Sequence, residues 1–253
     1  MTPPLYEARH LGFSYDAAEG GAVEALRDFS FTLRNGEFLS IIGPSGCGKT
    51  SLLKLLTGLQ RPVSGELLCR GKHFTTTPAD IGMAFQDSLL LPWRNVIDNV
   101  LLPIEILKRS RAEYLPKARD LLATVGLIGF EEKDPWQLSG GMRQRVSLCR
   151  ALITNPSVLL LDEPFAALDA FTREDLWLVL QELHQKTRST MVLITHQISE
   201  AVFLSDRVIV LSKRPGTVLL DQEIRISKPR SRDMLYKPDF IELVEVLRHK
   251  IER

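Results

Sequence analysis

Apolar and polar positions change their period several times along the chain. Residues 29–33 alternate Phe, Phe and Leu with polar residues, which predicts a half-buried strand. Asn35-Gly36 then predicts a tight turn, and residues 37–42 predict the returning strand of a hairpin. Leucines recur at helical spacing over residues 49–57, which predicts a helix that ends at the following glycine.

The middle of the chain has a different pattern from both ends. Strand signals vanish over residues 88–155, and helices are predicted at 112–125 and 140–153, which indicates a helical subdomain. Continuous apolar runs at 158–161, 191–195 and 208–211 predict buried parallel strands, and Thr172 with Asp175 predicts a capping box that opens a helix to about Lys186. This order predicts an α/β fold with a largely parallel sheet.

The C-terminal part carries two further signals. Residues 225–237 are basic and contain prolines, which predicts a solvated connector. Residues 238–251 place Phe240, Val244, Leu247 and Ile251 on one side of a helix, which predicts a helix that packs on the body of the protein.

Composition narrows the classes of function. The 253 residues carry a formal net charge of +1, so no overall field indicates a nucleic-acid partner. The three cysteines are far apart and odd in number, which argues against a disulfide framework or a zinc site. The first ten residues do not resemble a signal peptide, and no apolar run reaches the length of a membrane-spanning helix.

A glycine-rich loop supplies the first candidate chemistry. Residues 43–50 read Gly-Pro-Ser-Gly-Cys-Gly-Lys-Thr and fit the pattern G-x-x-x-x-G-K-[ST] between a predicted strand and a predicted helix. Such a loop turns backbone N–H groups toward phosphate oxygens, and the helix adds its positive N-terminal end. The candidate phosphate ligands are Gly43, Pro44, Ser45, Gly46, Cys47, Gly48, Lys49, Thr50 and Ser51. Lys49 can reach the β- and γ-phosphates, and the Thr50 hydroxyl can bind Mg²⁺.

An acidic pair of residues supplies the second candidate chemistry. The apolar run 158–161 leads into Asp162 and Glu163, at the end of a strand where such sheets bind ligands. Asp162 can hold the Mg²⁺ shell, and Glu163 can deprotonate an attacking water. Alone, an acidic pair after a strand is more often a capping turn, but beside a phosphate loop it favours catalysis.

Residues 138–144, Leu-Ser-Gly-Gly-Met-Arg-Gln, resemble the signature motif of ATP-binding-cassette (ABC) ATPases, which usually reads L-S-G-G-Q. Met142 stands where the glutamine is common. At the start of a helix, Ser139, Gly140 and Gly141 would present donors to an anion.

Further positions match the family in order. The resemblance implies that Tyr15 stacks on adenine, that Gln86 is the Q-loop contact to Mg²⁺ and water, that Asp169 ends the D-loop, and that His196 senses the γ-phosphate. Tyr15 has an ordinary strand tyrosine as its alternative. Ala166 stands where many relatives carry serine or glycine, so the resemblance does not support a hydroxyl contact at that position.

The resemblance also implies an architecture and partners. It implies a P-loop NTPase fold of the ABC type, with a RecA-like core over 1–86 and 156–226, an antiparallel β region, a helical subdomain over 87–155 and a tail over 227–253. It implies ATP and Mg²⁺ as cofactors and a homodimer in which the signature of one protomer closes over the ATP of the other. It further implies membrane permease subunits, indirectly an external solute-binding protein, and a peripheral place on the cytoplasmic face of a bacterial membrane.

One segment resembles a particular branch of the ABC family. Leu91-Pro92-Trp93 after Gln86, with Asp-Asn-Val at 98–100, is similar to the nitrate, sulfonate and taurine importer branch, and Arg214-Pro-Gly216 supports this. Trp93 would then contact the permease, with a partly buried aromatic as the alternative. The same branch includes importers of bicarbonate and pyrimidine vitamin precursors, so the solute stays open.

Three other functions are alternatives. A soluble ABC ATPase of DNA repair or translation usually carries two cassettes or a long coiled coil, and the chain has neither. A P-loop phosphotransferase is disfavoured by the Ser-Gly-Gly motif at 139–141. An ATPase for lipid or export systems remains an alternative within transport.

Overall fold

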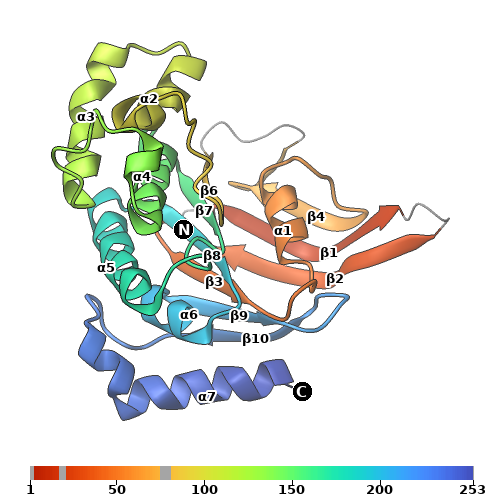
Figure 1. Ribbon diagram of the computed structural model, residues 1–253. Helices are drawn as coiled ribbons and strands as arrows, with labels where there is room; N and C mark the ends of the chain where they lie inside the picture. The colour runs from red at the N-terminus through yellow and green to blue at the C-terminus, as the bar shows by residue number, and fades with distance from the viewer. Residues whose placement is uncertain (1–2, 17–20, 75–80, 253) are drawn as a thin grey trace. The chain divides into compact units, whose positions relative to one another are not determined.

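The computed structural model describes residues 3–16, 21–74 and 81–252, and its chain divides into two compact units (Figure 1). Unit 1 comprises Met1–Ile81 and Thr190–Arg253, and unit 2 comprises Gly82–Ser189. The extreme residues of the predicted domains, 1–2 and 253, lie outside the described part.

Unit 1 contains an antiparallel sheet in the order β2-β1-β4-β5. Its strands are β1 (Tyr6–Asp16), β2 (Ala22–Leu33), β4 (Ser64–Cys69) and β5 (Lys72–His73). The end of β2 buries Phe29, Phe31 and Leu33 and exposes the residues between them, so the predicted half-buried strand is confirmed. One face of this sheet therefore forms core while the other meets solvent.

Unit 1 also contains four neighbouring strands in the order β10-β9-β3-β8. The strands β3 (Phe38–Ile42), β8 (Thr190–Thr195) and β9 (Arg207–Leu211) are parallel and buried at every position, and β10 (Val218–Glu223) pairs antiparallel with β9. Burial of every residue is typical of a parallel sheet covered on both faces. The predicted parallel strands at 191–195 and 208–211 are confirmed.

The hairpin predicted around Asn35-Gly36 is wrong. Strand β2 pairs with β1 in one sheet, whereas β3 pairs with β8 and β9 in the other. The turn switches sheets because Glu37 ties it to β9: its carboxylate accepts from the Arg34 backbone N–H at 2.8 Å and from the Arg207 Nε at 2.7 Å. Both Glu37 and Arg207 are buried, so the paired charges fix where β3 begins.

The helices of unit 1 follow its strands. Helix α1 (Lys49–Leu56) comes after β3, and α6 (Ile198–Leu204) comes after β8. The predicted end of α1 is confirmed, because Thr57 caps it and Gly58 has a left-handed φ of 71°. After the short 3-10 helix η2 (Arg232–Tyr236), α7 (Pro238–Glu252) packs beside α6 and β9 (Figure 1). Its buried Phe240 and Leu247 confirm the predicted packing helix.

The solvated connector predicted at 225–237 is wrong in one respect. Arg230 is only 2% exposed, and its guanidinium donates to the carbonyls of Val202, Phe203, Ser205 and Ile226. Three of these carbonyls lie at the C-terminal end of α6, where helices leave carbonyls without partners. Burial lowers the pKa of Arg230 to about 10. The connector is therefore anchored to unit 1 and not simply solvated.

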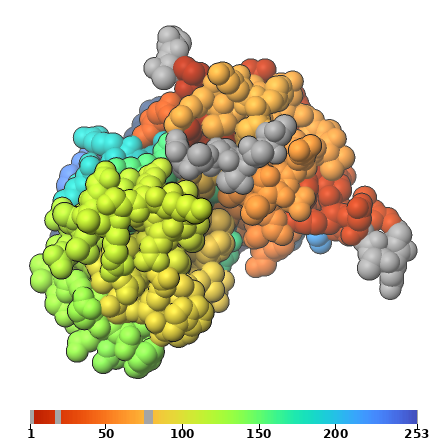
Figure 2. All heavy atoms as spheres, turned by 90° about the horizontal axis from the view of Figure 1, so that it is seen from above, coloured from red at the N-terminus to blue at the C-terminus, as the bar shows by residue number. Residues whose placement is uncertain are grey.

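Unit 2 contains two neighbouring strands and most of the helices. The strands are β6 (Ile81–Ala84) and β7 (Val158–Asp162), and the helices are α2 (Val96–Ile106), α3 (Arg111–Thr124), the 3-10 helix η1 (Pro135–Gln137), α4 (Gly140–Leu152) and α5 (Ala170–Thr187). Figure 2 shows α2 and α3, in yellow to yellow-green, gathered on one face of this unit. The helices predicted at 112–125 and 140–153 and the strand at 158–161 are confirmed. Helix α2, which contains Pro103, was not predicted as a separate element within the helical region 88–155.

The capping box predicted at Thr172 and Asp175 is wrong. The N-cap of α5 is Asp169, whose carboxylate accepts from the Thr172 backbone N–H at 3.0 Å. These hydrogen bonds hold the pKa of Asp169 below its usual value. An aspartate at this position satisfies an unpaired N–H of the first turn, so the helix begins before Thr172.

Candidate nucleotide-binding site

The glycine-rich loop of unit 1 joins the buried strand β3 to α1. Gly48, the N-cap of α1, has φ of 107°, and a Cβ there would lie 2.6 Å from the Ala25 carbonyl oxygen. Only glycine fits both the left-handed backbone and this close approach to β2. The loop is thus shaped by backbone packing against its neighbours.

Lys49 is buried over this loop. Its ammonium donates to the carbonyls of Gly43 at 2.8 Å and Pro44 at 2.9 Å, and its Nζ lies 3.9 Å from the Cys47 Sγ. A fixed cation beside the N-terminus of α1 is the arrangement that binds phosphate. Ser45, Gly46 and Thr50 are exposed around it. Burial raises the pKa of the Cys47 thiol, so this side chain adds no negative charge to the loop.

A second loop supports the phosphate loop, and sequence reasoning missed its role. Gly216 donates to the Ala25 carbonyl at 2.9 Å and accepts from the Arg27 N–H at 3.1 Å. A Cβ on Gly216 would lie 2.2 Å from the Cys47 carbonyl oxygen. The glycine after Pro215 was the available signal, because it allows two backbones to approach closely.

Tyr15 lies at the end of β1, half-buried beside α1. Its hydroxyl lies 3.0 Å from the Ser51 Oγ, its ring packs edge-on against Phe13, and the Lys54 Nζ lies 5.4 Å from the ring centroid. Ser51 is buried and contacts Tyr15 with its hydroxyl. The ring is therefore fixed in orientation, and its stacking on adenine stays a prediction.

His196 leaves the sheet beside the phosphate loop. Ile42 of β3 pairs with Thr195 of β8, so Gly43 and His196 both follow the carboxyl ends of neighbouring parallel strands. His196 is exposed, while Thr195 Oγ1 donates to the buried Glu200 and accepts from the Gln197 N–H. Unit 1 thus brings four of the predicted residues, Lys49, Thr50, Tyr15 and His196, to the ends of its strands and the start of α1.

Unit 2 carries the other predicted residues. Gln86 and Asp87 are exposed just after β6, and we call residues 86–91 the Q-loop. Ser139 is the N-cap of α4 and accepts from the Met142 N–H at 3.2 Å. Gly141 is buried, and a Cβ there would lie 2.3 Å from the Thr172 Cγ2. Ser139 and Gly140 remain exposed at the positive end of the helix, as an anion site requires.

The acidic pair ends strand β7. Asp162 is its last residue, and Glu163 has a left-handed φ of 46°, which is uncommon outside glycine. Both residues are half-buried. The Glu163 carbonyl accepts from the Ala166 N–H at 3.1 Å, so the chain turns sharply toward Asp169. Strained backbone of this kind gathers at functional sites.

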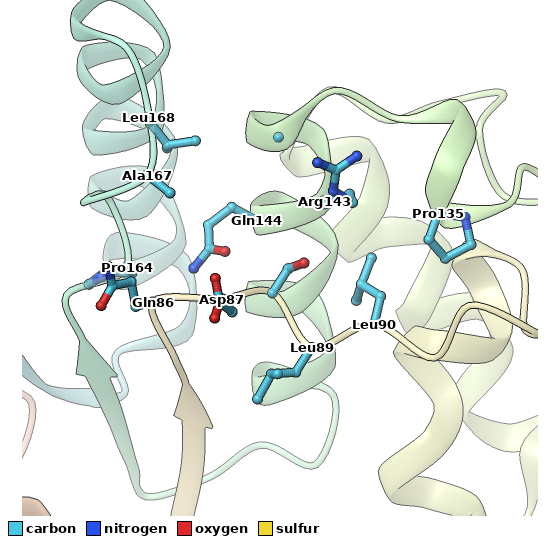
Figure 3. Close-up of a pocket in the computed structure, with 12 residues that line it drawn as sticks. Gln86, Asp87, Leu89, Leu90, Pro135, Arg143, Gln144, Pro164, Ala167 and Leu168 are labelled. Atoms are coloured by element: carbon cyan, nitrogen blue, oxygen red, sulfur yellow. The ribbon is translucent and has the colours of Figure 1, made fainter.

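A cavity of about 300 Å³ joins these segments of unit 2. Figure 3 shows Gln86 and Asp87 between α4, which contributes Arg143 and Gln144, and the loop of Pro164, Ala167 and Leu168. The Q-loop, helix α4, which begins at the signature motif and is called the signature helix below, and the D-loop before Asp169 therefore line one cavity. Sequence reasoning missed two residues that hold the Q-loop: Gln144 donates to the carbonyl just before Gln86, and Arg150 donates to two carbonyls after it.

These features define a P-loop nucleotide-binding protein: a glycine-rich loop and lysine between a buried strand and a helix, and an acidic pair after a second strand. A family model described as "ABC transporter" matches residues 26–166. The chain belongs to the ABC transporter family and is one of its ATP-binding ATPases. The described residues include no helix of the length and apolarity needed to cross a membrane.

Named relatives cover most of the chain. It is 42% identical to the "Taurine import ATP-binding protein TauB" of Escherichia coli over 95% of this chain and 96% of that protein. It is 44% identical to the "Uncharacterized ABC transporter ATP-binding protein MJ0412" of Methanocaldococcus jannaschii over 84% and 80%. The predicted resemblance to the importer branch that includes taurine and sulfonate systems is confirmed by the taurine import relative.

Solved structures give the same fold. A dimeric post-hydrolysis state of the ATP-binding cassette MJ0796 bound to ADP and Pi has a TM-score of 0.74 and 31% identity, covering 88% of this chain and all of that one. The structure of cbiO1 from Clostridium perfringens has a TM-score of 0.78 and shares the fold. The predicted ABC cassette fold is confirmed.

Proposed function

We propose that this chain is the ATP-hydrolysing subunit of an importer for a small sulfonate such as taurine. The observation that carries the proposal is the 42% identity to the taurine import subunit along nearly the whole of both chains. Nitrate, a pyrimidine vitamin precursor and other solutes of the same branch are competing cargoes.

Each chemical role that the family resemblance implies has a residue in this chain. The buried Lys49 and the loop amides would bind the β- and γ-phosphates, and Tyr15 would stack on the adenine. Glu163 would take the proton of the attacking water, and His196 would contact the γ-phosphate. Mg²⁺ would supply charge stabilisation; Thr50, Gln86 and Asp162 offer hydroxyl, amide and carboxylate oxygens, which fit its preference for oxygen ligands.

We propose that two copies share each ATP. Ser139 and Gly140 are exposed at a helix N-terminus, where they could bind a phosphate held by a second protomer. The dimeric cassette bound to ADP and Pi supports this arrangement. In the same proposal, 1–86 and 156–226 form the nucleotide-binding core, 87–155 the helical subdomain, and 227–253 the tail.

The remaining partners follow from the same relationship. The exposed Trp93, next to the Q-loop, would contact permease subunits on the cytoplasmic face of the membrane. An external solute-binding protein would select the cargo. No role in nucleic-acid binding is proposed, because the net charge is close to zero.

The test is reconstitution of the subunit with its permease in vesicles. Taurine-loaded binding protein should stimulate ATP hydrolysis and taurine uptake together. Nitrate and hydroxymethylpyrimidine, tested the same way, separate the cargoes. Hydrolysis that only another solute stimulates would overturn the proposed cargo, and absence of ATP hydrolysis by the complete complex would overturn the proposed activity.

A further inference from the structure

We infer that Gln144 and Arg150 are positioning residues, which clamp the Q-loop to the signature helix so that a displacement of one moves the other. The inference rests on the proposed function, because it concerns how that ATPase is coupled to its permease. Both residues lie on α4, whose N-cap is Ser139 of the signature motif.

The clamp consists of three hydrogen bonds that span long separations in sequence. Gln144 Nε2 donates to the Phe85 carbonyl at 2.9 Å, on one side of Gln86. Arg150 donates from Nη2 to the Ser88 carbonyl at 2.7 Å and from Nη1 to the Leu89 carbonyl at 2.8 Å, on the other side. The Q-loop glutamine is therefore held from both ends by one helix.

Burial makes these contacts strong. Gln144 is 3% exposed, and burial lowers the pKa of the half-buried Arg150. A polar group removed from water loses free energy unless it keeps a hydrogen bond, so both the donors and the carbonyls depend on this pairing. Leu89 has a left-handed φ of 47°, a conformation that needs support from its surroundings.

Helix α4 connects the clamped Q-loop to the signature motif at its N-terminus. Helix α4 has 13 residues and spans about 20 Å at the usual rise per residue. Gln144 and Arg150 are spaced along it, so the Q-loop is attached at two separated points and cannot pivot about one. A shift of the loop would consequently carry Ser139 and Gly140, the exposed donors of the signature motif.

The link extends to the surface. Asn99 of α2 is fully buried; its Oδ1 accepts from the Leu91 N–H at 2.7 Å, and its Nδ2 donates to the carbonyls of Leu91, Arg94 and Asn95. These bonds fix the turn that presents Trp93, which is 75% exposed. Side-chain-to-backbone bonds therefore hold both the turn around Trp93 and the preceding Q-loop, which is itself tied to α4.

The experiment compares Arg150→Met and Gln144→Met with a matched control, Arg145→Met. Arg145 lies on the same helix and also donates to a backbone carbonyl, that of Val125 at 2.9 Å, but not in the Q-loop. Arg150→Lys keeps the charge, but its single ammonium replaces the two-nitrogen fork of the guanidinium. This variant takes the place of Arg150→Met in the comparison if Arg150→Met fails to fold.

Two measurements are made. Hydrogen exchange of the Q-loop amides in the isolated subunit should be about tenfold faster or more in the clamp variants, and unchanged in Arg145→Met. In the complete transporter, the ratio of solute-stimulated to basal ATP hydrolysis should fall toward one in the clamp variants, with Arg150→Lys between them and the wild type. The control should keep the wild-type ratio.

Three results would overturn the clamp: unchanged exchange in its variants, faster exchange with an unchanged ratio, or an equal loss of the ratio in Arg145→Met. The exchange measurement does not depend on transport. If the wild-type complex shows no solute stimulation, the proposed cargo or activity fails, and unchanged exchange in the variants would still overturn the clamp separately.

Discussion

The two units position their candidate residues in different ways. In unit 1 the phosphate loop follows a fully buried strand and is shaped by backbone approaches at Gly48 and Gly216. In unit 2 the Q-loop is exposed and is held by the long side chains of Gln144 and Arg150. A site fixed by close-packed backbone is rigid, whereas a loop tied by side chains to a helix can move together with that helix.

This difference matches the proposed roles of the two units. Phosphate binding needs N–H groups and a cation held in fixed positions, because their value comes from preorganisation. A loop that reports on the permease must instead change position and pass that change on. Substitutions in the two units should therefore differ in what they impair.

Glu163→Gln should lower the rate of ATP hydrolysis by roughly 10²–10⁴-fold, because the amide cannot accept the proton of the attacking water. Nucleotide binding should survive, since it uses the phosphate loop of unit 1, and the ATP-bound dimer should accumulate. Phosphate release gives the rate, and size-exclusion chromatography with ATP and then ADP gives the oligomer.

The matched control for this variant is Glu182→Gln, which removes an exposed carboxylate of α5 that pairs with Lys186. It should hydrolyse ATP at the wild-type rate. An undiminished rate in Glu163→Gln would exclude Glu163 as the base, and a monomer with both nucleotides, in the isolated subunit and with the permease, would contradict the shared site.

Lys49→Ala should weaken ATP binding by about 10- to 100-fold, the usual range for losing a charge-assisted contact. The buried ammonium is held at the loop by the carbonyls of Gly43 and Pro44, so no other side chain of the loop replaces its charge. Titration calorimetry measures the affinity, with Lys72→Ala on the exposed strand β5 as the control. Wild-type affinity in Lys49→Ala would remove this residue from the binding site.

Gly216→Ala tests whether backbone packing shapes the phosphate loop. The added Cβ would meet the Cys47 carbonyl at 2.2 Å, so the variant should lose about 1–3 kcal/mol of stability and also bind ATP less tightly. Gly71→Ala is the control: its φ of 75° disfavours alanine, but no atom lies within 4 Å of the new Cβ. Denaturant unfolding and ATP titration should show that Gly71→Ala loses stability alone. Equal ATP affinity in both variants would contradict the supporting role of Gly216.

The same contrast explains which features the sequence could predict. The phosphate loop, α1 and the buried strands were predictable because each depends on residues close in the chain, such as the glycines and Lys49 beside an apolar run. The acidic pair after β7 was predictable for the same reason. Their roles in binding and catalysis remain predictions.

Other features depend on partners far away in the sequence. Whether β3 pairs with β2 is decided by Glu37 and Arg207, which are separated by 170 residues, so the local Asn-Gly signal misled. The predicted solvated connector includes Arg230, which instead binds the end of α6, and Arg150 reaches carbonyls 61 and 62 residues away. No local pattern distinguishes these arginines from surface ones.

Trp93→Ala should have the smallest effect on the isolated subunit and a clear effect only in the complex. The side chain is 75% exposed on a turn that Asn99 holds by its backbone, so its removal should leave stability and ATP affinity within error of the wild type. If the ring contacts the permease, burial of an aromatic at an interface makes its truncation cost more than about 1 kcal/mol, and assembly or taurine uptake should fall.

Trp136→Ala is the matched control, because Trp136 is another tryptophan of unit 2, 67% exposed on η1. Co-purification with the permease and uptake in vesicles measure both variants. Equal losses for the two tryptophans would show that exposure of an aromatic, and not its place beside the Q-loop, determines the effect, and normal assembly and uptake by Trp93→Ala would exclude this turn as the permease contact.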